Sequence, residues 1–89
     1  MPQWEICRIK EVYRKQWWVL VTWTMVKYIA VLDTPGGEYA IDQTIELHHV
    51  AGEKQNHERA MLVGRLLTQG WEPIGTEYGL VTVLRRQVP

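Results

Sequence analysis

The sequence is poor in the features that would point to a particular chemistry. It has no phenylalanine and a single cysteine, and its ten basic residues balance its ten acidic residues. One cysteine excludes an internal disulfide and suits the reducing cytoplasm, where we expect the protein. A dedicated binder of nucleic acid or of an anionic membrane would need a basic face, so the neutral balance argues against both.

The chain is also short. Its 89 residues leave room for one domain, residues 1–89, with one hydrophobic core. A chain of this size buries only about 60–65% of the surface that its unfolded form exposes. We therefore expect marginal stability and help from a partner chain.

A hydrophobic run long enough for a membrane helix is missing as well. The most apolar stretch, residues 17–32, is shorter than the roughly 20 residues that a bilayer requires, and it contains Lys27. It is rich in β-branched and aromatic residues, which favour strands. The stretch therefore predicts one long strand, bent or bulged and apolar on both faces, that lies inside a sheet rather than in a membrane.

The rest of the first half predicts two more strands. Residues 4–13 alternate loosely between apolar and polar and predict the first strand, which ends at a polar break over residues 14–16. Residues 33–37 contain a proline and two glycines, which is typical of a tight turn. Residues 39–47 alternate more regularly and predict a half-buried strand.

A helix is predicted over residues 56–69. Its apolar stripe contains Leu62, Val63, Leu66 and Leu67. Asn56 is a suitable N-cap, and Gly70 stands where a helix ends on a left-handed residue. A pair of strands then closes the chain, with a turn at residues 77–79 and a β-branched run at residues 80–84.

These elements predict an α+β fold. An antiparallel sheet of four to five strands, in the chain order β-β-β-α-β-β, has the helix packed on one face. The predicted core consists of Trp71, Leu62, Val63, Leu66, Leu67, Val21, Trp23, Ile41, Ile45, Val81 and Val83.

The last third of the chain resembles a known group of proteins. A start of the type Trp4-Glu5-Ile6, a late helix, the run Leu66-Leu67-Thr68-Gln69-Gly70-Trp71-Glu72-Pro73 and a last strand ending in Arg85 and Arg86 are similar to the small bacterial domain-of-unknown-function family 4177. The likeness covers residues 57–86. It implies a bacterial source and supports the helix, the Gly-Trp-Glu turn and the final strand, and it brings no established activity with it.

Two parts of the chain are candidate chemical sites. The cluster of His48, His49, Glu53, His57 and Glu58 invites a metal interpretation, but neighbouring residues on a strand point to opposite faces and no His-x-x-x-His pair shares a helix face. A solvated loop leading into the helix is the simpler interpretation. We expect no metal, no cofactor and no catalytic residue in this segment.

Cys7 is the second candidate, as a nucleophile with a histidine base. A lone cysteine in an alternating strand is typical of a small buried hydrophobe. No neighbouring helix start or glycine-rich turn is predicted that could activate it. We therefore expect a non-catalytic domain.

The aromatic residues favour an interaction role. The chain has five tryptophans and four tyrosines, residues that suit interfaces because one end is apolar and the other polar. Trp17, Trp18, Trp23 and Tyr28 cannot all pack under one helix, and we expect them at an interface. The favoured partner is a second copy in a homodimer, followed by another protein.

An aromatic sheet face that binds single-stranded nucleic acid or a small ligand is the alternative. Nucleic-acid binding would need interleaved basic residues. The basic residues nearby are few: Arg8, Lys10, Arg14, Lys15 and Lys27.

Overall fold

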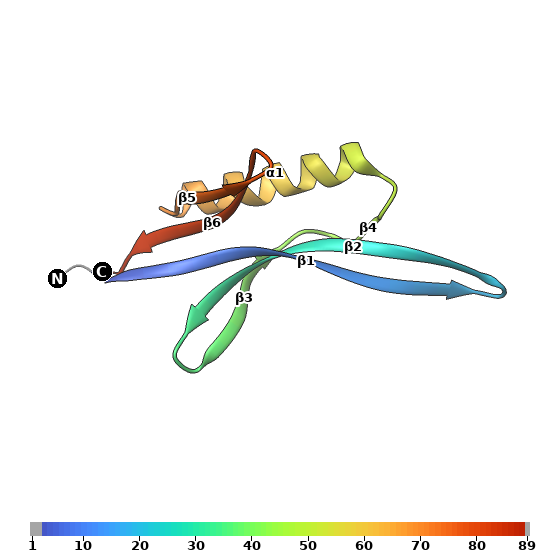
Figure 1. Cartoon of the computed structure of the whole chain (residues 1–89), viewed down its shortest axis with the longest axis horizontal. Coiled ribbons are helices and arrows are strands. Elements are labelled where there is room, and N and C mark those ends of the chain that lie inside the picture. The colour runs from blue at the N-terminus through green and yellow to red at the C-terminus, as the bar shows by residue number, and fades with distance from the viewer. Residues whose placement is uncertain (1–2, 89) are drawn as a thin grey trace.

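Residues 3–88 fold into one antiparallel sheet with a single helix on one face, which confirms the predicted α+β class (Figure 1). The computed structural model describes residues 3–88. The elements in chain order are β1 (Trp4–Trp18), β2 (Val21–Thr34), β3 (Gly37–Gln43), β4 (Leu47–His48), α1 (Gly52–Thr68), β5 (Glu72–Glu77) and β6 (Leu80–Gln87).

The strands lie in the order β3-β2-β1-β6-β5, and the short β4 also pairs with β2. β1 and β2 form one long hairpin whose register runs from Ile6 opposite Asp33 to Trp18 opposite Val21. β6 pairs with only the first part of β1, from Trp4 to Arg8. Among the residues that the structure describes, the second half of β1 therefore pairs with a strand on one side only.

The predicted break at residues 14–16 is wrong. β1 continues through these residues to Trp18, and the chain reverses at Val19 and Leu20. The stretch predicted as one strand over residues 17–32 is therefore divided between two strands. Polar side chains at residues 14–16 do not interrupt a strand whose two faces both reach solvent there, so the polarity of this segment misled the prediction.

The helix starts earlier than predicted. It begins at Gly52, with Ala51 at the N-cap position and no side-chain cap, whereas Asn56 lies inside the helix. Residues 52–55 are polar, so the apolar periodicity that predicted the helix could not reveal its first turn. The side chain of Gln55 ties this turn to the preceding loop by donating to the carbonyls of His48 and His49.

The end of the helix agrees with the prediction. Gly70 has φ of +91°, a conformation that glycine adopts without a Cβ penalty. The Trp71 N–H then donates to the Leu66 carbonyl at 3.1 Å. This turn carries the Trp71 ring back into the core, where it is 3% exposed.

The core lies between α1 and the sheet, and the far end of the β1–β2 hairpin does not contribute to it. Its buried cluster consists of Cys7, Ile9, Tyr28, Ala30, Leu62, Leu66, Trp71 and Leu84. Three of the predicted core residues, Leu62, Leu66 and Trp71, are confirmed. Val63 and Val81 are partly buried against the cluster.

Several predicted core residues are not in the core. Trp23 and Val83 are half-buried, while Val21, Ile41, Ile45 and Leu67 are exposed. Val21 lies at the far end of the hairpin, Ile41 lies where the pairing of β3 with β2 shifts register, and Ile45 follows the end of β3. Alternation showed that these residues share a face, but not whether another element covers that face.

Thr44 compensates for the early end of β3. Its N–H donates to the Tyr28 carbonyl at 2.9 Å, and its hydroxyl oxygen accepts from the Tyr28 N–H at 3.0 Å. Both backbone groups of Tyr28 therefore stay paired although β3 has ended at Gln43. The segment between β3 and β4 is thus fixed to the outer edge of β2.

Candidate interaction surface

The hairpin of β1 and β2 projects beyond the rest of the molecule (Figure 1). We call residues 15–24 the distal hairpin. Within it, Lys15 to Trp18 pair with Val21 to Thr24, and no other strand among residues 3–88 pairs with either segment. A single bond from the His49 N–H to the Thr24 carbonyl fixes its base. The principal axes of the molecule extend over 57 × 28 × 20 Å, so the chain is markedly elongated.

The end of the distal hairpin is an exposed apolar surface, which we call the tip. It consists of residues 17–21. Trp17 is 68% exposed, Trp18 70% and Leu20 95%. Val19 and Val21 are exposed as well. No residue from 16 to 26 carries a charge, so the tip has no charged side chain of its own.

Both faces of the tip are apolar. Cys7 and Ile9 are buried on the face that α1 covers, and side chains alternate along a strand. Tyr13 and Trp17 therefore lie on that same face, beyond the end of the helical cover, whereas Trp18 lies on the opposite face. The tip cannot be covered by packing one face of the hairpin onto the body of its own chain.

The turn at the tip is strained. Val19 has φ of +53°, a region that β-branched residues rarely adopt. Such a conformation costs on the order of 1–3 kcal/mol. A β-branched apolar residue therefore occupies a turn position where asparagine or glycine would be more stable.

β1 also presents an open edge. The carbonyls of Thr24 and Tyr28 accept bonds from residues on the outer side of β2, so the even-numbered residues of β2 point away from β1. Gln16 lies opposite Trp23, and the even-numbered residues of β1 therefore bond to β2. The backbone groups of the odd-numbered residues point to the other edge, and these residues are Glu11, Tyr13, Lys15 and Trp17.

That edge is free of β pairing in the described part of the chain. The pairing with β6 ends where Arg8 lies opposite Val83. An unpaired strand edge is a template for another strand, and proteins usually protect it with charges, proline or a cover. Among the residues Glu11, Tyr13, Lys15 and Trp17, which direct their backbone groups to this edge, only Glu11 and Lys15 are charged.

The charges at the base of the hairpin are largely paired. Arg14 donates to both carboxylate oxygens of Glu46, at 2.9 and 3.0 Å, and this contact lowers the pKa of Glu46 below its ordinary value. The Tyr13 hydroxyl donates to Glu11, which raises the pKa of Tyr13. The base of the hairpin therefore carries paired charges, whereas the tip carries no charged side chain.

The structure separates the residues predicted for the interface. Trp17 and Trp18 end β1 and form part of the tip. Trp23 is half-buried and lies opposite Gln16 in the distal hairpin. Tyr28 is 7% exposed and belongs to the core, beneath the guanidinium of Arg59. Val19, Leu20 and Val21 complete the surface. Sequence reasoning missed them because it placed this run within a strand rather than at a turn.

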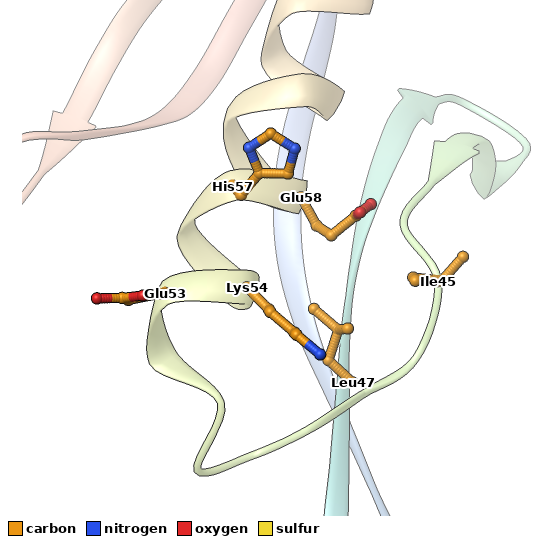
Figure 2. Close-up of a pocket in the computed structure, with 6 residues that line it drawn as sticks. All are labelled: Ile45, Leu47, Glu53, Lys54, His57 and Glu58. Atoms are coloured by element: carbon orange, nitrogen blue, oxygen red, sulfur yellow. The ribbon is translucent and has the colours of Figure 1, made fainter.

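Three of the five residues suspected of metal binding, Glu53, His57 and Glu58, line an open pocket at the start of α1, whereas His48 and His49 do not (Figure 2). Its volume is about 460 Å³, and it is lined by Ile45, Leu47, Glu53, Lys54, His57 and Glu58. In Figure 2 the Lys54 side chain lies beside Leu47, while Glu53 points away from both. Within residues 3–88 there is no group of three or more histidine, cysteine, aspartate or glutamate side chains placed to hold a metal ion.

Cys7 has the surroundings of a core residue. It is fully buried, and burial raises the pKa of its thiol to about 11. The thiol is therefore protonated at neutral pH, and the thiolate is the nucleophilic form. These surroundings do not activate Cys7 for chemistry.

Comparison with known proteins adds no relative. The chain matches no family model and has no match among curated proteins or solved structures. No helix in residues 3–88 is long and apolar enough to cross a membrane. Any functional conclusion therefore depends on the surface of this chain alone.

Proposed function

We propose that this chain is a non-catalytic self-associating domain, and that the distal hairpin joins two copies into a homodimer. The observation that carries this proposal is the tip, where apolar side chains from both strands and from the turn are all exposed. The likeness of residues 57–86 to a family without known activity is compatible with such a role and stays a prediction.

The size of the tip supports an interface. A tryptophan side chain contributes about 150–250 Å² of surface, and both tryptophans at the tip are more than two-thirds exposed. With the three neighbouring aliphatic residues, the patch reaches several hundred Å², as large as monomers usually expose. A stable interface needs about 800 Å² from each partner, which the tip and the adjoining strands can supply together.

A second copy is the simplest partner. Each chain carries the same patch, and a two-fold axis brings identical patches together in a closed assembly. The alternative of single-stranded nucleic acid requires cations interleaved with the aromatic rings. The tip has none, Arg14 at its base is held by Glu46, and Lys15 is the one cation among residues 15–24. The charge distribution thus favours a protein contact.

A matched pair of variants tests the proposal. Trp17→Glu places a carboxylate within the proposed contact, where its burial without a partner costs several kcal/mol. Tyr39→Glu introduces the same charge at a 55% exposed residue of β3, on the far side of β2 from β1. We expect sedimentation velocity to show a monomer for Trp17→Glu and a dimer for Tyr39→Glu. Equal masses for the two variants would contradict a contact at the tip.

A further inference from the structure

We infer that the two copies join through the open edges of their β1 strands, which pair antiparallel about a two-fold axis at Arg14. The result is one sheet that is continuous across the dimer. This inference rests on the proposed self-association and adds the mode of contact. It follows from three features: the direction of the backbone groups, the place where β6 stops, and the order of charges along β1.

The backbone groups provide the bonding. Glu11, Tyr13, Lys15 and Trp17 direct their N–H and C=O groups to the edge that β6 leaves after Arg8. A strand from a second copy satisfies these groups with the pattern of an ordinary antiparallel ladder. The opposite edge of the distal hairpin is shorter, because β4 pairs with Met25 and Val26.

Symmetry limits the register. In an antiparallel pair, residues that face each other lie on the same side of the sheet, so a two-fold axis through the sheet places one residue opposite its own copy. If that residue were Tyr13 or an earlier one, Trp18 of the second copy would lie opposite Arg8 or beyond. That place is already taken by Val83 of β6. The axis must therefore lie at Arg14 or nearer the tip.

The charges choose among the remaining registers. An axis at Lys15 would bring two ammonium groups opposite each other, which is destabilising. An axis at Gln16 or beyond shortens the overlap to the last residues of β1. An axis at Arg14 keeps the longest overlap that β6 permits. It also places two guanidinium groups opposite each other, but each is already held by its own Glu46 at 2.9–3.0 Å.

Side chains complement each other in this register. Tyr13 lies opposite Lys15 of the second copy, which suits a contact between a cation and an aromatic ring. Glu11 lies opposite Trp17 of the second copy and diagonal to its Lys15, within reach of the ammonium group. The two-fold axis repeats both contacts.

The same register gives the tip a place to dock. Trp18 of the second copy lies opposite Lys10, and the turn that follows it reaches the point where β6 separates from β1. Leu80 and Val81 of β6 line an open pocket of about 290 Å³ there, together with residues of α1. The apolar turn at Val19 and Leu20 of the second copy therefore meets an apolar pocket rather than solvent.

Cysteine cross-linking tests the register. Arg14→Cys places two thiols at the axis. The two copies of this residue would face each other as a non-hydrogen-bonded pair, in which the Cα atoms lie about 4.5 Å apart. Val12→Cys and Gln16→Cys place each thiol two residues from the axis, so that the two copies of one thiol are about 13 Å apart. Under mild oxidation we expect a rapid disulfide dimer from Arg14→Cys and not from either of the others. The double variant Val12→Cys with Gln16→Cys should cross-link, because these residues face each other.

The wild-type chain is the matched control, since its buried Cys7 should stay reduced. A disulfide dimer from Val12→Cys or Gln16→Cys alone, or equal rates for the three single variants, would overturn the inference. If a variant that gives one of these results is still a dimer by mass, self-association stands and only the mode of contact is wrong. A monomeric mass for the wild-type chain would remove both.

A second pair of variants probes the edge without cysteines. Lys15→Pro removes an N–H on the open edge of β1, whereas Thr22→Pro removes one on the outer edge of β2. We expect both to keep the circular dichroism of the wild type and only Lys15→Pro to become monomeric. A dimeric Lys15→Pro would contradict pairing at this edge. A monomeric wild-type chain whose tryptophan fluorescence shifts on addition of phosphatidylserine vesicles would contradict it as well.

Discussion

The guanidinium of Arg59 lies over the ring of Tyr28, with 5.0 Å between its central carbon and the ring centroid. The same group donates to the Val81 carbonyl at 2.8 Å and lies 4.0 Å from a carboxylate oxygen of Glu11. Arg59 is 5% exposed, so one buried cation connects α1 with β1, β2 and β6. It fixes the body of the molecule at the point from which the distal hairpin projects.

Replacement of Arg59 should separate its packing from its charge. Arg59→Ala leaves a cavity and an unpaired Val81 carbonyl, and we expect a loss of about 3–5 kcal/mol of unfolding free energy. Arg59→Met keeps most of the volume but also leaves the Val81 carbonyl unpaired, so we expect a smaller loss of about 1–3 kcal/mol. Urea unfolding checks the order: an equal loss in both variants would show that the charge itself is required.

Trp71 should be the most sensitive aromatic residue. Its ring is 3% exposed and lies under the guanidinium of Arg86, 4.5 Å from the ring centroid. We expect Trp71→Ala to cost about 3–5 kcal/mol, as large-to-small core changes do. Tyr39→Ala at an exposed site is the control and should change the unfolding free energy by about 0.5 kcal/mol or less. Similar losses in the two variants would place Trp71 outside the core.

The stability should fall in acid partly through Asp42. Arg65 donates to both of its carboxylate oxygens, at 2.9 and 3.2 Å, and lowers the pKa of Asp42 below its ordinary value of 3.8. A carboxyl whose pKa is lower in the folded state stabilises the fold above its unfolded pKa, and this stabilisation disappears as the pH falls through the folded pKa. Asp42→Asn should therefore be less stable than wild type at pH 7.

The difference between Asp42→Asn and wild type should shrink when the pH falls below 3.8. Urea unfolding from pH 7 to pH 3 measures it. A difference that stays constant over this range would show that the carboxylate charge contributes nothing.

Cys7 should resist thiol reagents in the folded protein. Burial raises the pKa of its thiol to about 11, so little thiolate exists at pH 8, and the side chain is fully enclosed. We expect a disulfide reagent to label Cys7 only after unfolding in urea, with an introduced thiol at the exposed residue Tyr39, in Tyr39→Cys, reacting at once as a control. Fast labelling of native wild-type protein would contradict the position of Cys7 in the core.

The strained turn offers a test that separates stability from association. Val19→Asn suits the positive φ of this residue, and we expect a gain of about 1 kcal/mol in the unfolding free energy of the monomer. The same change removes an apolar side chain from the tip and should weaken dimerisation. A variant that is more stable and associates as strongly as wild type would mean that Val19 lies outside the contact.

The sequence predicted the fold where a local pattern determined it. The turn at Pro35 and Gly36, the turn at Tyr78 and Gly79, and the helix end at Gly70 are all observed. In each case glycine or proline restricts or frees the backbone by itself. The start of α1 was missed because its first turn is polar and has no side-chain cap.

The interaction surface was predicted only in part, for a related reason. Trp17 and Trp18 were predicted at an interface because four aromatic residues of this region cannot all pack under one helix. The hairpin turn beside them consists of Val19 and Leu20, which give no turn signal. The sequence therefore could not show that these tryptophans lie at a tip. Nor could it show that Tyr28 is buried, since its ring lies beneath the guanidinium of Arg59, a residue of α1 that is distant in the sequence.

The mass of the unmodified chain in solution tests the central claim most directly. Light scattering coupled to size exclusion, repeated from about 1 μM to about 100 μM, covers the range in which weak and moderate protein contacts form. The account predicts a mass near twice the 10.5 kDa of the chain at the higher concentrations. A mass of 10.5 kDa that does not change across the whole range would contradict self-association through the distal hairpin.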